Sequence, residues 1–322
     1  MKYSQIEIIA LAALGIVLPL IGVYPTFLMQ CWCFALFACA YNLLLGYGGL
    51  TSFGHAAFFG SAAYITGHCV KVLGFPPELG ILAGTAVACV LGFIVGSIAI
   101  RRQGIYFAMI TLALAQMVYF VWVQLRFTGG EDGLQNVPRG RLLGLIPLQD
   151  TLTMYYLVFA IFFAGFLLIY RIINSPFGQV LRAIRENESR ALSLGYDVDR
   201  FKKIAFILSA SLSGLAGATK TLVFQLASLT DAHWAMSGEA IMMTLLGGVG
   251  TVFGPVVGAF LVVSLETQLA SRVGAWVQVI MGVIFAICVI SFRRGIVGVI
   301  QQRIARHRKP AITLEAHDAS QG

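Results

Sequence analysis

Hydrophobic residues fill long, nearly uninterrupted runs between residues 6 and 292, and short polar stretches separate these runs. Many runs approach about 20 residues, the length that an α-helix needs to cross a hydrocarbon core of about 30 Å. The alternating segments of roughly ten residues that are typical of a transmembrane β-barrel are absent from the sequence. The pattern therefore predicts an all-α polytopic membrane protein.

The runs predict about ten transmembrane helices, some of them short or broken. The predicted spans are Ile6–Val23, Phe27–Leu45, Gly54–Val72, Leu79–Ile100, Gly104–Leu125, Met154–Ile173, Ile204–Phe224, Ser237–Val249, Val252–Glu266 and Ala275–Phe292. The eighth and ninth spans could form one long helix, but the glycines and Pro255 of LGGVGTVFGP favour a break. Ser237 is a plausible N-cap for the eighth span, and Glu239 would then lie in its first turn.

Composition agrees with this class, because only 11% of the residues are charged, against about 25% in soluble domains. The net charge of +8 is explained by membrane orientation, so no nucleic-acid partner is expected. If the N-terminus is cytosolic, most of the 22 Lys and Arg residues lie on the cytosolic side, as the positive-inside tendency requires. We therefore expect both termini in the cytosol and contact with membrane lipid.

No chemistry of an enzyme is visible in the sequence. The six cysteines lie inside apolar runs without paired CxxC spacing, which is typical of small hydrophobic side chains in a bundle. The sequence has no GxxxxGK[ST] phosphate loop, no HExxH and no GxSxG. We expect no catalytic residue, no metal and no bound cofactor.

One charged stretch, SPFGQVLRAIRENESRALSLGYDVDRFKK, interrupts the apolar pattern. Ser175 and Pro176 form a helix-start signal, Gly195 is a natural stop, and Asp197 offers a cap for the next span. Between these signals the spacing predicts one short amphipathic helix, with Glu186 and Arg190 in the favourable i,i+4 order. Acidic and basic residues are mixed on its polar face, which favours docking to a protein over binding to an anionic lipid surface.

Three blocks of the chain carry a family resemblance. FGQVLRAIRENESRALSLGYDVDRFKKIAFILSASLSGLAGA, YNLLLGYGGLTSFGHAAFFGSAAY and SGEAIMMTLLGGVGTVFGPVVGAF resemble LivM-type permeases, the membrane subunits of branched-chain amino acid ABC importers. The resemblance implies a permease of the bacterial inner membrane that passes such amino acids into the cytosol. Its implied partners are a sister permease, two cytosolic ABC ATPases, which use the ATP, and a periplasmic substrate-binding protein.

Two alternatives remain open at this point. A permease of the same family could carry urea or a short amide. An ion-coupled secondary transporter would belong to a different class, but such carriers usually hold carboxylates at mid-membrane. In the predicted spans, both Glu239 and Glu266 lie near the ends.

The resemblance implies that the charged stretch, residues 174–203, is a cytosolic coupling loop seated in an ATPase. The residues that match the family's loop pattern are Gly178, Arg182, Ala183, Arg185, Glu186, Asn187, Ala191, Gly195 and Tyr196.

A solute that crosses an apolar route needs polar partners, and the glycine-rich segments could open backbone groups to a cavity. The candidate pathway residues are Asn42, Gly48, Gly49, Thr51, Ser52, His55, Glu239, Thr244, Gly247 and Gly248. A single histidine such as His55 is more often a packing residue than a ligand contact.

The expected organisation is a transmembrane permease domain over residues 1–292 that contains the coupling loop. A basic and then polar cytosolic tail is expected over residues 293–322. The loop over residues 126–153 is expected outside the cytosol, as a docking surface or a solvated connection.

Overall fold

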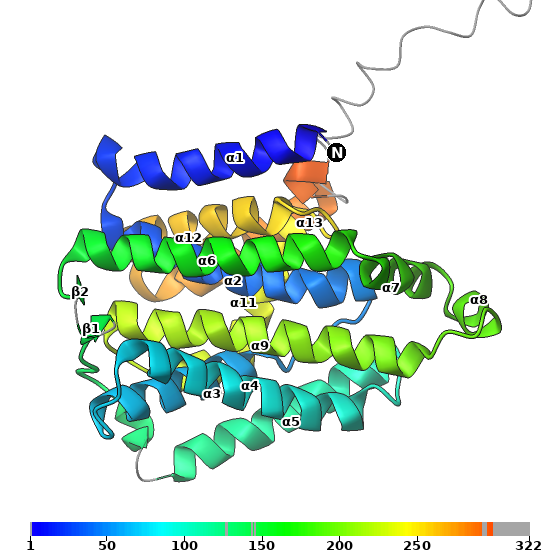
Figure 1. The fold of residues 1–322 in the computed structure, drawn as a ribbon, viewed down its shortest axis with the longest axis horizontal. Helices are drawn as coiled ribbons and strands as arrows, with labels where there is room; N and C mark the ends of the chain where they lie inside the picture. Colours follow the sequence, from blue (N-terminus) through cyan, green and yellow to red (C-terminus); the bar gives the residue numbers. More distant parts are fainter. Residues whose placement is uncertain (1, 126–127, 143, 145, 292–294, 299–322) are drawn as a thin grey trace, which may run out of the picture.

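The computed structural model describes residues 2–125, 128–142, 144, 146–291 and 295–298. Within these residues the chain is an elongated bundle of helices whose long members run side by side (Figure 1). The longer helices are α1 (Lys2–Val17), α2 (Pro25–Asn42), α3 (His55–Lys71), α4 (Pro77–Ala99), α5 (Ile105–Gln124), α6 (Thr151–Asn174), α9 (Val198–Phe224), α11 (Trp234–Gly247), α12 (Gly254–Val273) and α13 (Val277–Ser291). The shorter elements are η1 (Leu18–Ile21), η2 (Leu43–Tyr47), η4 (Gly130–Asp132), β1 (Arg141–Leu142), β2 (Ile146–Pro147), α7 (Pro176–Glu186), α8 (Glu188–Ser193), α10 (Leu229–Ala232) and η5 (Gly274–Trp276).

The predicted all-α membrane class is confirmed, and each of the predicted spans overlaps one helix of the bundle. Five segments of the described residues are long and apolar enough to cross a membrane: Pro25–Tyr47, Pro77–Ala99, Ile105–Gln124, Thr151–Asn174 and Val198–Phe224. The remaining predicted spans fall on α1, α3, α11, α12 and α13, which do not meet that criterion. The protein is therefore a multi-pass membrane protein.

The break between the eighth and ninth spans is confirmed, because α11 ends at Gly247 and α12 begins at Gly254. The predicted N-cap at Ser237 is wrong. The cap of α11 is His233, whose extended backbone (φ −71°, ψ 143°) separates α10 from α11. The Ser237 hydroxyl instead accepts a hydrogen bond from the backbone N–H of Ala56 at 2.8 Å.

This earlier start of α11 moves Glu239 away from a span end. Glu239 is the sixth residue of α11, and Glu266 lies inside α12. The expectation that both carboxylates lie near span ends is therefore wrong for this bundle. Their position removes one of the arguments that separated an ABC permease from an ion-coupled carrier.

The centre of the bundle is α2, whose membrane-length segment is 89% buried. It packs against α6, α9, α11 and α12. Trp32 of α2 lies among aromatic rings of α6 and α12, with its ring centroid 4.6 Å from that of Phe162 and 4.8 Å from that of Phe260. Its indole Nε1 donates a hydrogen bond to the Tyr155 hydroxyl at 3.2 Å. Each of these contacts orients α2 inside its ring of neighbours.

Small residues bring α3, α4 and α9 into close contact, as the four-residue spacing of glycine, alanine and serine predicts. A Cβ atom added at Gly217 of α9 would lie 2.1 Å from the Phe59 carbonyl oxygen of α3. A Cβ atom at Gly214 would lie 2.2 Å from that of Ala88 on α4. These backbones approach too closely for any side chain at the two glycines.

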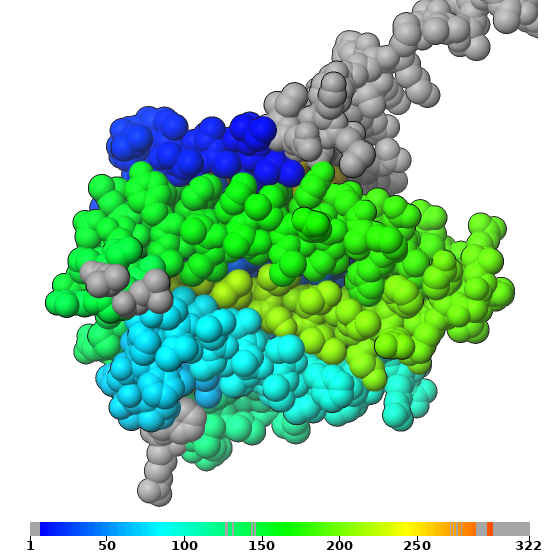
Figure 2. Space-filling view, in the orientation of Figure 1, coloured from blue at the N-terminus to red at the C-terminus, as the bar shows by residue number. Residues whose placement is uncertain are grey.

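The loop between α5 and α6 packs on one end of the bundle. β1 and β2 form a two-stranded antiparallel ribbon, and Leu134 forms an isolated bridge with Ala227. The Arg139 guanidinium donates to the Val223 carbonyl oxygen at 2.8 Å. α7 and α8 project from the opposite end, as Figures 1 and 2 show. Residues 293–294 and 299–322 of the predicted tail lie outside the described residues.

Candidate functional site

The projecting tip consists of α7 and α8, the two short helices between α6 and α9. Ser175 caps α7 by accepting a hydrogen bond from the Gly178 N–H at 3.4 Å, as the start signal predicts. The prediction of one continuous helix is wrong, because Asn187 adopts φ −156° and ψ 97°. Its side chain caps α8 by accepting from the Arg190 N–H at 2.9 Å. The tip is therefore two helices joined at a corner.

This corner separates the two members of the predicted i,i+4 pair, since Glu186 ends α7 and Arg190 lies on α8. A different acidic residue anchors the tip. The Glu188 carboxylate lies 2.8 Å from the Lys202 ammonium of α9. It also accepts a hydrogen bond at 2.8 Å from the amide of Gln103, which lies between α4 and α5. Three segments of the chain thus meet at α8.

Two glycines shape the tip. A Cβ atom at Gly178 would lie 2.3 Å from the Ile173 carbonyl oxygen, so the tight turn from α6 into α7 requires a residue without a side chain. Gly195 adopts φ +85° just after α8, which confirms the predicted stop. Asp197 then caps α9 by accepting from the Arg200 N–H at 3.1 Å.

One face of the tip is apolar and buried. Leu181 and Ile184 of α7, Ala191 of α8 and Val198 of α9 are at most 3% exposed. The last three form a small cluster of their own, whereas Leu181 belongs to the main core. The tip therefore packs as a unit against the bundle.

Two arginines of α7 fasten the tip to the end of α2. The Arg185 guanidinium donates a hydrogen bond to the Gly46 carbonyl oxygen in η2. The Arg182 guanidinium lies over the Tyr47 ring at 5.0 Å from its centroid and donates to the Ile173 carbonyl oxygen at 3.3 Å. Both guanidinium groups therefore contact the membrane domain of their own chain. η2 is a π-helical turn, a form that occurs frequently at functional sites.

The opposite face of the tip is exposed and partly apolar. Leu192, Leu194 and Tyr196 are 65%, 70% and 40% exposed, and Ala183 and Glu186 of α7 are exposed as well. Large apolar side chains that project together from a polar end of the molecule are typical of an interaction surface.

Asn42 joins the end of α2 to the turn between α11 and α12. Its amide nitrogen donates to the Thr251 carbonyl oxygen at 2.8 Å, and its amide oxygen accepts from the Gly250 N–H at 2.9 Å. At 2% exposure, Asn42 is a buried tie between two segments far apart in the sequence. A Cβ atom at Gly46 would lie 2.6 Å from the Gly250 nitrogen, so the two turns touch.

The two glycine-rich turns use the same local chemistry. The Ser52 hydroxyl accepts a hydrogen bond from the Gly54 N–H at 3.1 Å, just before α3. The Thr251 hydroxyl accepts from the Gly254 N–H at 3.1 Å, at the start of α12. Each turn also contains a glycine with positive φ: Gly49 (φ +69°) in the first turn and Gly250 (φ +76°) in the second. Both turns start a helix that leaves the tip end of the bundle.

His55 lies at the first position of α3 and is fully buried. Its Nε2 lies 2.7 Å from the Ser209 hydroxyl of α9, and that hydroxyl donates to the Ala40 carbonyl oxygen at 2.6 Å. The Tyr41 and Phe58 rings meet the imidazole edge to face. The structure places His55 as a packing link between α2, α3 and α9.

Four of the other predicted pathway residues lie at different places in the bundle. Thr244 is buried and donates to the Ala240 carbonyl oxygen at 2.8 Å. Gly247 packs directly on the Gly254 carbonyl group. Gly49 and Thr51 line an apolar cavity of about 500 Å³ beside α5.

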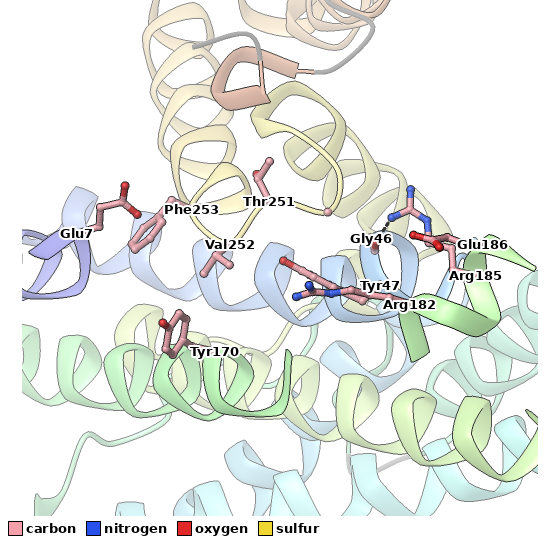
Figure 3. Close-up of a pocket in the computed structure, with 11 residues that line it drawn as sticks. Glu7, Gly46, Tyr47, Tyr170, Arg182, Arg185, Glu186, Thr251, Val252 and Phe253 are labelled. Atoms are coloured by element: carbon pink, nitrogen blue, oxygen red, sulfur yellow. Dashed lines mark hydrogen bonds between the residues drawn. The ribbon is translucent and has the colours of Figure 1, made fainter. Parts of the chain in front are cut away.

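A second cavity, of about 650 Å³, lies where the tip meets the bundle (Figure 3). Its lining comes from α1, α6, α7, η2 and the turn between α11 and α12. The lining residues are Glu7, Gly46, Tyr47, Tyr170, Arg182, Arg185, Glu186, Gly250, Thr251, Val252 and Phe253. Three predicted coupling residues, Arg182, Arg185 and Glu186, line this cavity. They lie there beside the turn between α11 and α12, which contains Gly248 of the predicted pathway residues. Sequence reasoning missed Gly46, Tyr47 and Thr251, although all three lie inside the blocks that carry the family resemblance.

A helical bundle that contains five membrane-length segments, with a short helical tip fastened to its central helix, defines a multi-pass membrane protein. Over residues 24–289 the chain matches the family of the branched-chain amino acid transport system / permease component. The chain belongs to this family of transport permeases, which are not enzymes and bind no cofactor.

Similar proteins share about a quarter of their residues with this chain. The high-affinity branched-chain amino acid transport system permease protein LivM of Escherichia coli is 27% identical, and the match covers 69% of this chain and 58% of that protein. The probable branched-chain amino acid transport permease protein LivM of Methanocaldococcus jannaschii is 25% identical, over 71% and 76% of the two chains. The autoinducer 2 import system permease protein LsrC of Klebsiella pneumoniae is 28% identical, over 66% and 60%. The match thus spans less than two thirds of the Escherichia coli and Klebsiella relatives.

Proposed function

We propose that this chain is the permease subunit of an ABC importer that carries branched-chain or similar amino acids into the cytosol. ATP hydrolysis in separate subunits drives the transport, and the α7–α8 tip receives the force. The observation that carries the proposal is the tip itself, which is fastened to the most buried helix on one side and exposed and apolar on the other.

The contacts of α7 supply the mechanical link. Arg185 is bonded to the Gly46 carbonyl oxygen, and Gly46 touches the turn between α11 and α12 through Gly250. A displacement of α7 therefore acts at once on the end of α2 and on the start of α12. Packed helices transmit such displacements because their contacts leave little free space.

The exposed face of the tip is the proposed contact with an ABC ATPase. Leu192, Leu194 and Tyr196 supply apolar area, while Glu186 and Arg190 supply charges of both signs around it. A partner that binds this face with different affinity in its two nucleotide states can shift the permease between two conformations. A sister permease, two ATPases and a periplasmic binding protein complete the proposed assembly.

The proposed substrate class follows from the relatives named for branched-chain amino acids. The relative named for autoinducer 2 import makes that solute the comparison in any substrate test. With the tip in the cytosol, the α5–α6 loop lies on the periplasmic side and the N-terminus in the cytosol of a bacterial inner membrane.

The test is uptake by proteoliposomes that contain the complex purified through this chain. We expect leucine uptake that requires ATP and loaded binding protein and that persists after ion gradients are collapsed. Uptake that follows an ion gradient and ignores ATP would overturn the proposal in favour of a secondary transporter. A complex that hydrolyses ATP but carries only urea, a short amide or autoinducer 2 would support the ABC importer class and contradict the proposed amino-acid substrate.

A further inference from the structure

The cavity where the tip meets the bundle brings four charged side chains together. Arg182, Arg185 and Glu186 line it from α7, and Glu7 lines it from α1. Figure 3 shows Glu7 at one side of this cavity and Glu186 at the other. Two positive and two negative groups thus surround one space of about 650 Å³. A volume of this size lies within the range of about 300–1,000 Å³ that is usual for small-molecule sites.

The four charged groups are not paired with one another. The ion pairs that the structure shows among the described residues lie elsewhere, at Lys202 and at Lys220. Each guanidinium carries five N–H donors, and the hydrogen bonds of Arg182 and Arg185 to backbone carbonyl oxygens use one donor from each. Donors therefore remain for an anionic group that enters the cavity.

The cavity lies at the level where the membrane-spanning segments end. Tyr47 is the last residue of the segment Pro25–Tyr47, and Tyr170 lies four residues before the end of Thr151–Asn174. Both tyrosines line the cavity. Tyrosine is enriched at the membrane–water interface, at the level of the lipid headgroups. The charged groups of the cavity are therefore at the depth of the headgroups.

α1 is the wall between the cavity and the lipid. Ile9 and Leu14 of α1 are 67% and 53% exposed, whereas Ile8 packs against the core of the bundle. Towards the other end of α1, the Tyr155 hydroxyl donates to the Gly15 carbonyl oxygen at 2.6 Å. α1 thus lies on the surface of the bundle, with apolar side chains facing outward and Glu7 at the cavity.

We propose that this cavity binds the headgroup of a phospholipid that carries both a phosphate and a primary ammonium group. Arg182 and Arg185 face the phosphate, because guanidinium groups form strong, often paired hydrogen bonds with phosphate oxygens. Glu7 faces the ammonium group, and Glu186 remains on the side of the exposed tip. Basic pockets between membrane helices hold lipid headgroups in general, and the carboxylate here adds a preference for an ammonium group. The bound lipid bridges α1 and α7, whichever solute the protein carries.

The test measures the lipid that the purified complex retains after delipidation and exposure to equal amounts of phosphatidylethanolamine and phosphatidylglycerol. We expect native mass spectrometry to show that wild type prefers phosphatidylethanolamine by about tenfold, as a charge-assisted hydrogen bond implies. Arg182→Gln should lower the retention of both lipids by about tenfold, because both carry the phosphate. Glu7→Gln should lower only the retention of phosphatidylethanolamine, to the level of phosphatidylglycerol. Glu7 makes no contact with the tip helices through Arg182 or Arg185, so this result does not depend on the stability of the tip.

The matched controls are Arg190→Gln and Asp150→Asn, because both residues are exposed and neither lines the cavity. Both variants should keep the preference of wild type. Phosphatidylcholine, whose quaternary ammonium group has no N–H donor, should be retained no better than phosphatidylglycerol.

A competition experiment distinguishes a lipid from a soluble ligand. Glycerophosphoethanolamine has the same headgroup without acyl chains, and it should not displace phosphatidylethanolamine at equal concentration. Displacement by this compound would assign the cavity to a soluble phosphate ligand, and displacement by leucine would assign it to a solute; either result overturns the lipid assignment. Equal retention of phosphatidylethanolamine and phosphatidylglycerol by wild type, or wild-type retention by Arg182→Gln or Glu7→Gln, also overturns the inference.

Discussion

Replacing Arg185 by alanine tests the link between the tip and the central helix. Arg185→Ala removes the hydrogen bond to the Gly46 carbonyl oxygen. That oxygen lies at the end of a helix, where carbonyl groups depend on partners from outside the helix. We expect α7 to detach from the bundle more often and the protein to remain folded, because Leu181 and Ile184 stay buried.

The magnitude follows from the kind of bond. A hydrogen bond from a charged donor contributes about 1.5–3 kcal/mol. Arg185 is exposed to solvent, so we reduce this to about 1–2 kcal/mol to allow for screening. A change of that size multiplies the population of the detached tip by about 5–30.

Hydrogen exchange of the α7 amides in nanodiscs measures this population, since exchange reports local opening. Arg190→Ala is the matched control, because Arg190 is an exposed arginine of the same tip whose backbone N–H is satisfied by Asn187. The exchange rate of the α7 amides in Arg185→Lys should lie between the rates in Arg185→Ala and Arg190→Ala, because a lysine keeps the charge but lacks the planar guanidinium. Exchange in Arg185→Ala that matches Arg190→Ala would refute the proposed link.

The remaining predictions concern close packing, the buried amide and the exposed face of the tip. Gly217→Ala forces α3 and α9 apart and should lower the free energy of unfolding by about 1–3 kcal/mol. The Tm in detergent should therefore fall. Gly238→Ala is the control, because its Cβ atom would meet open space, and it should leave the Tm unchanged. Asn42→Ala removes two hydrogen bonds worth about 1–3 kcal/mol together, so an unchanged Tm would contradict the role of Asn42 as a tie. Glu186→Arg reverses a charge on the exposed face and should weaken ATPase binding in a pull-down assay without changing the exchange of α7; equal capture of the ATPase would place the interface elsewhere.

The elements of this fold were largely predictable, because hydrophobic run length and local capping signals operate within a few residues. Ser175 and Asp197 begin helices as their side chains predict. Asn187 was harder, since an asparagine inside an amphipathic pattern is compatible with either a helix or a cap. The π turn at the end of α2 has no local sequence signal of this kind, and it became visible only through its contacts.

The chemistry of the site was less predictable, because it depends on segments far apart in the chain. From the sequence, Arg185 is expected on the surface of the charged stretch, yet its guanidinium donates a hydrogen bond to the Gly46 carbonyl oxygen. His55 shows the converse, because a conspicuous histidine proves to be a packing link.

The length of α9 determines where the tip stands relative to the bilayer. Its 27 residues span about 40 Å, and an average tilt of about 20° still leaves about 38 Å along the membrane normal. The hydrocarbon layer takes up about 30 Å of this, so the first turns of α9 raise α8 through the headgroups into water. The proposed ATPase can therefore contact the tip from several sides without displacing lipid.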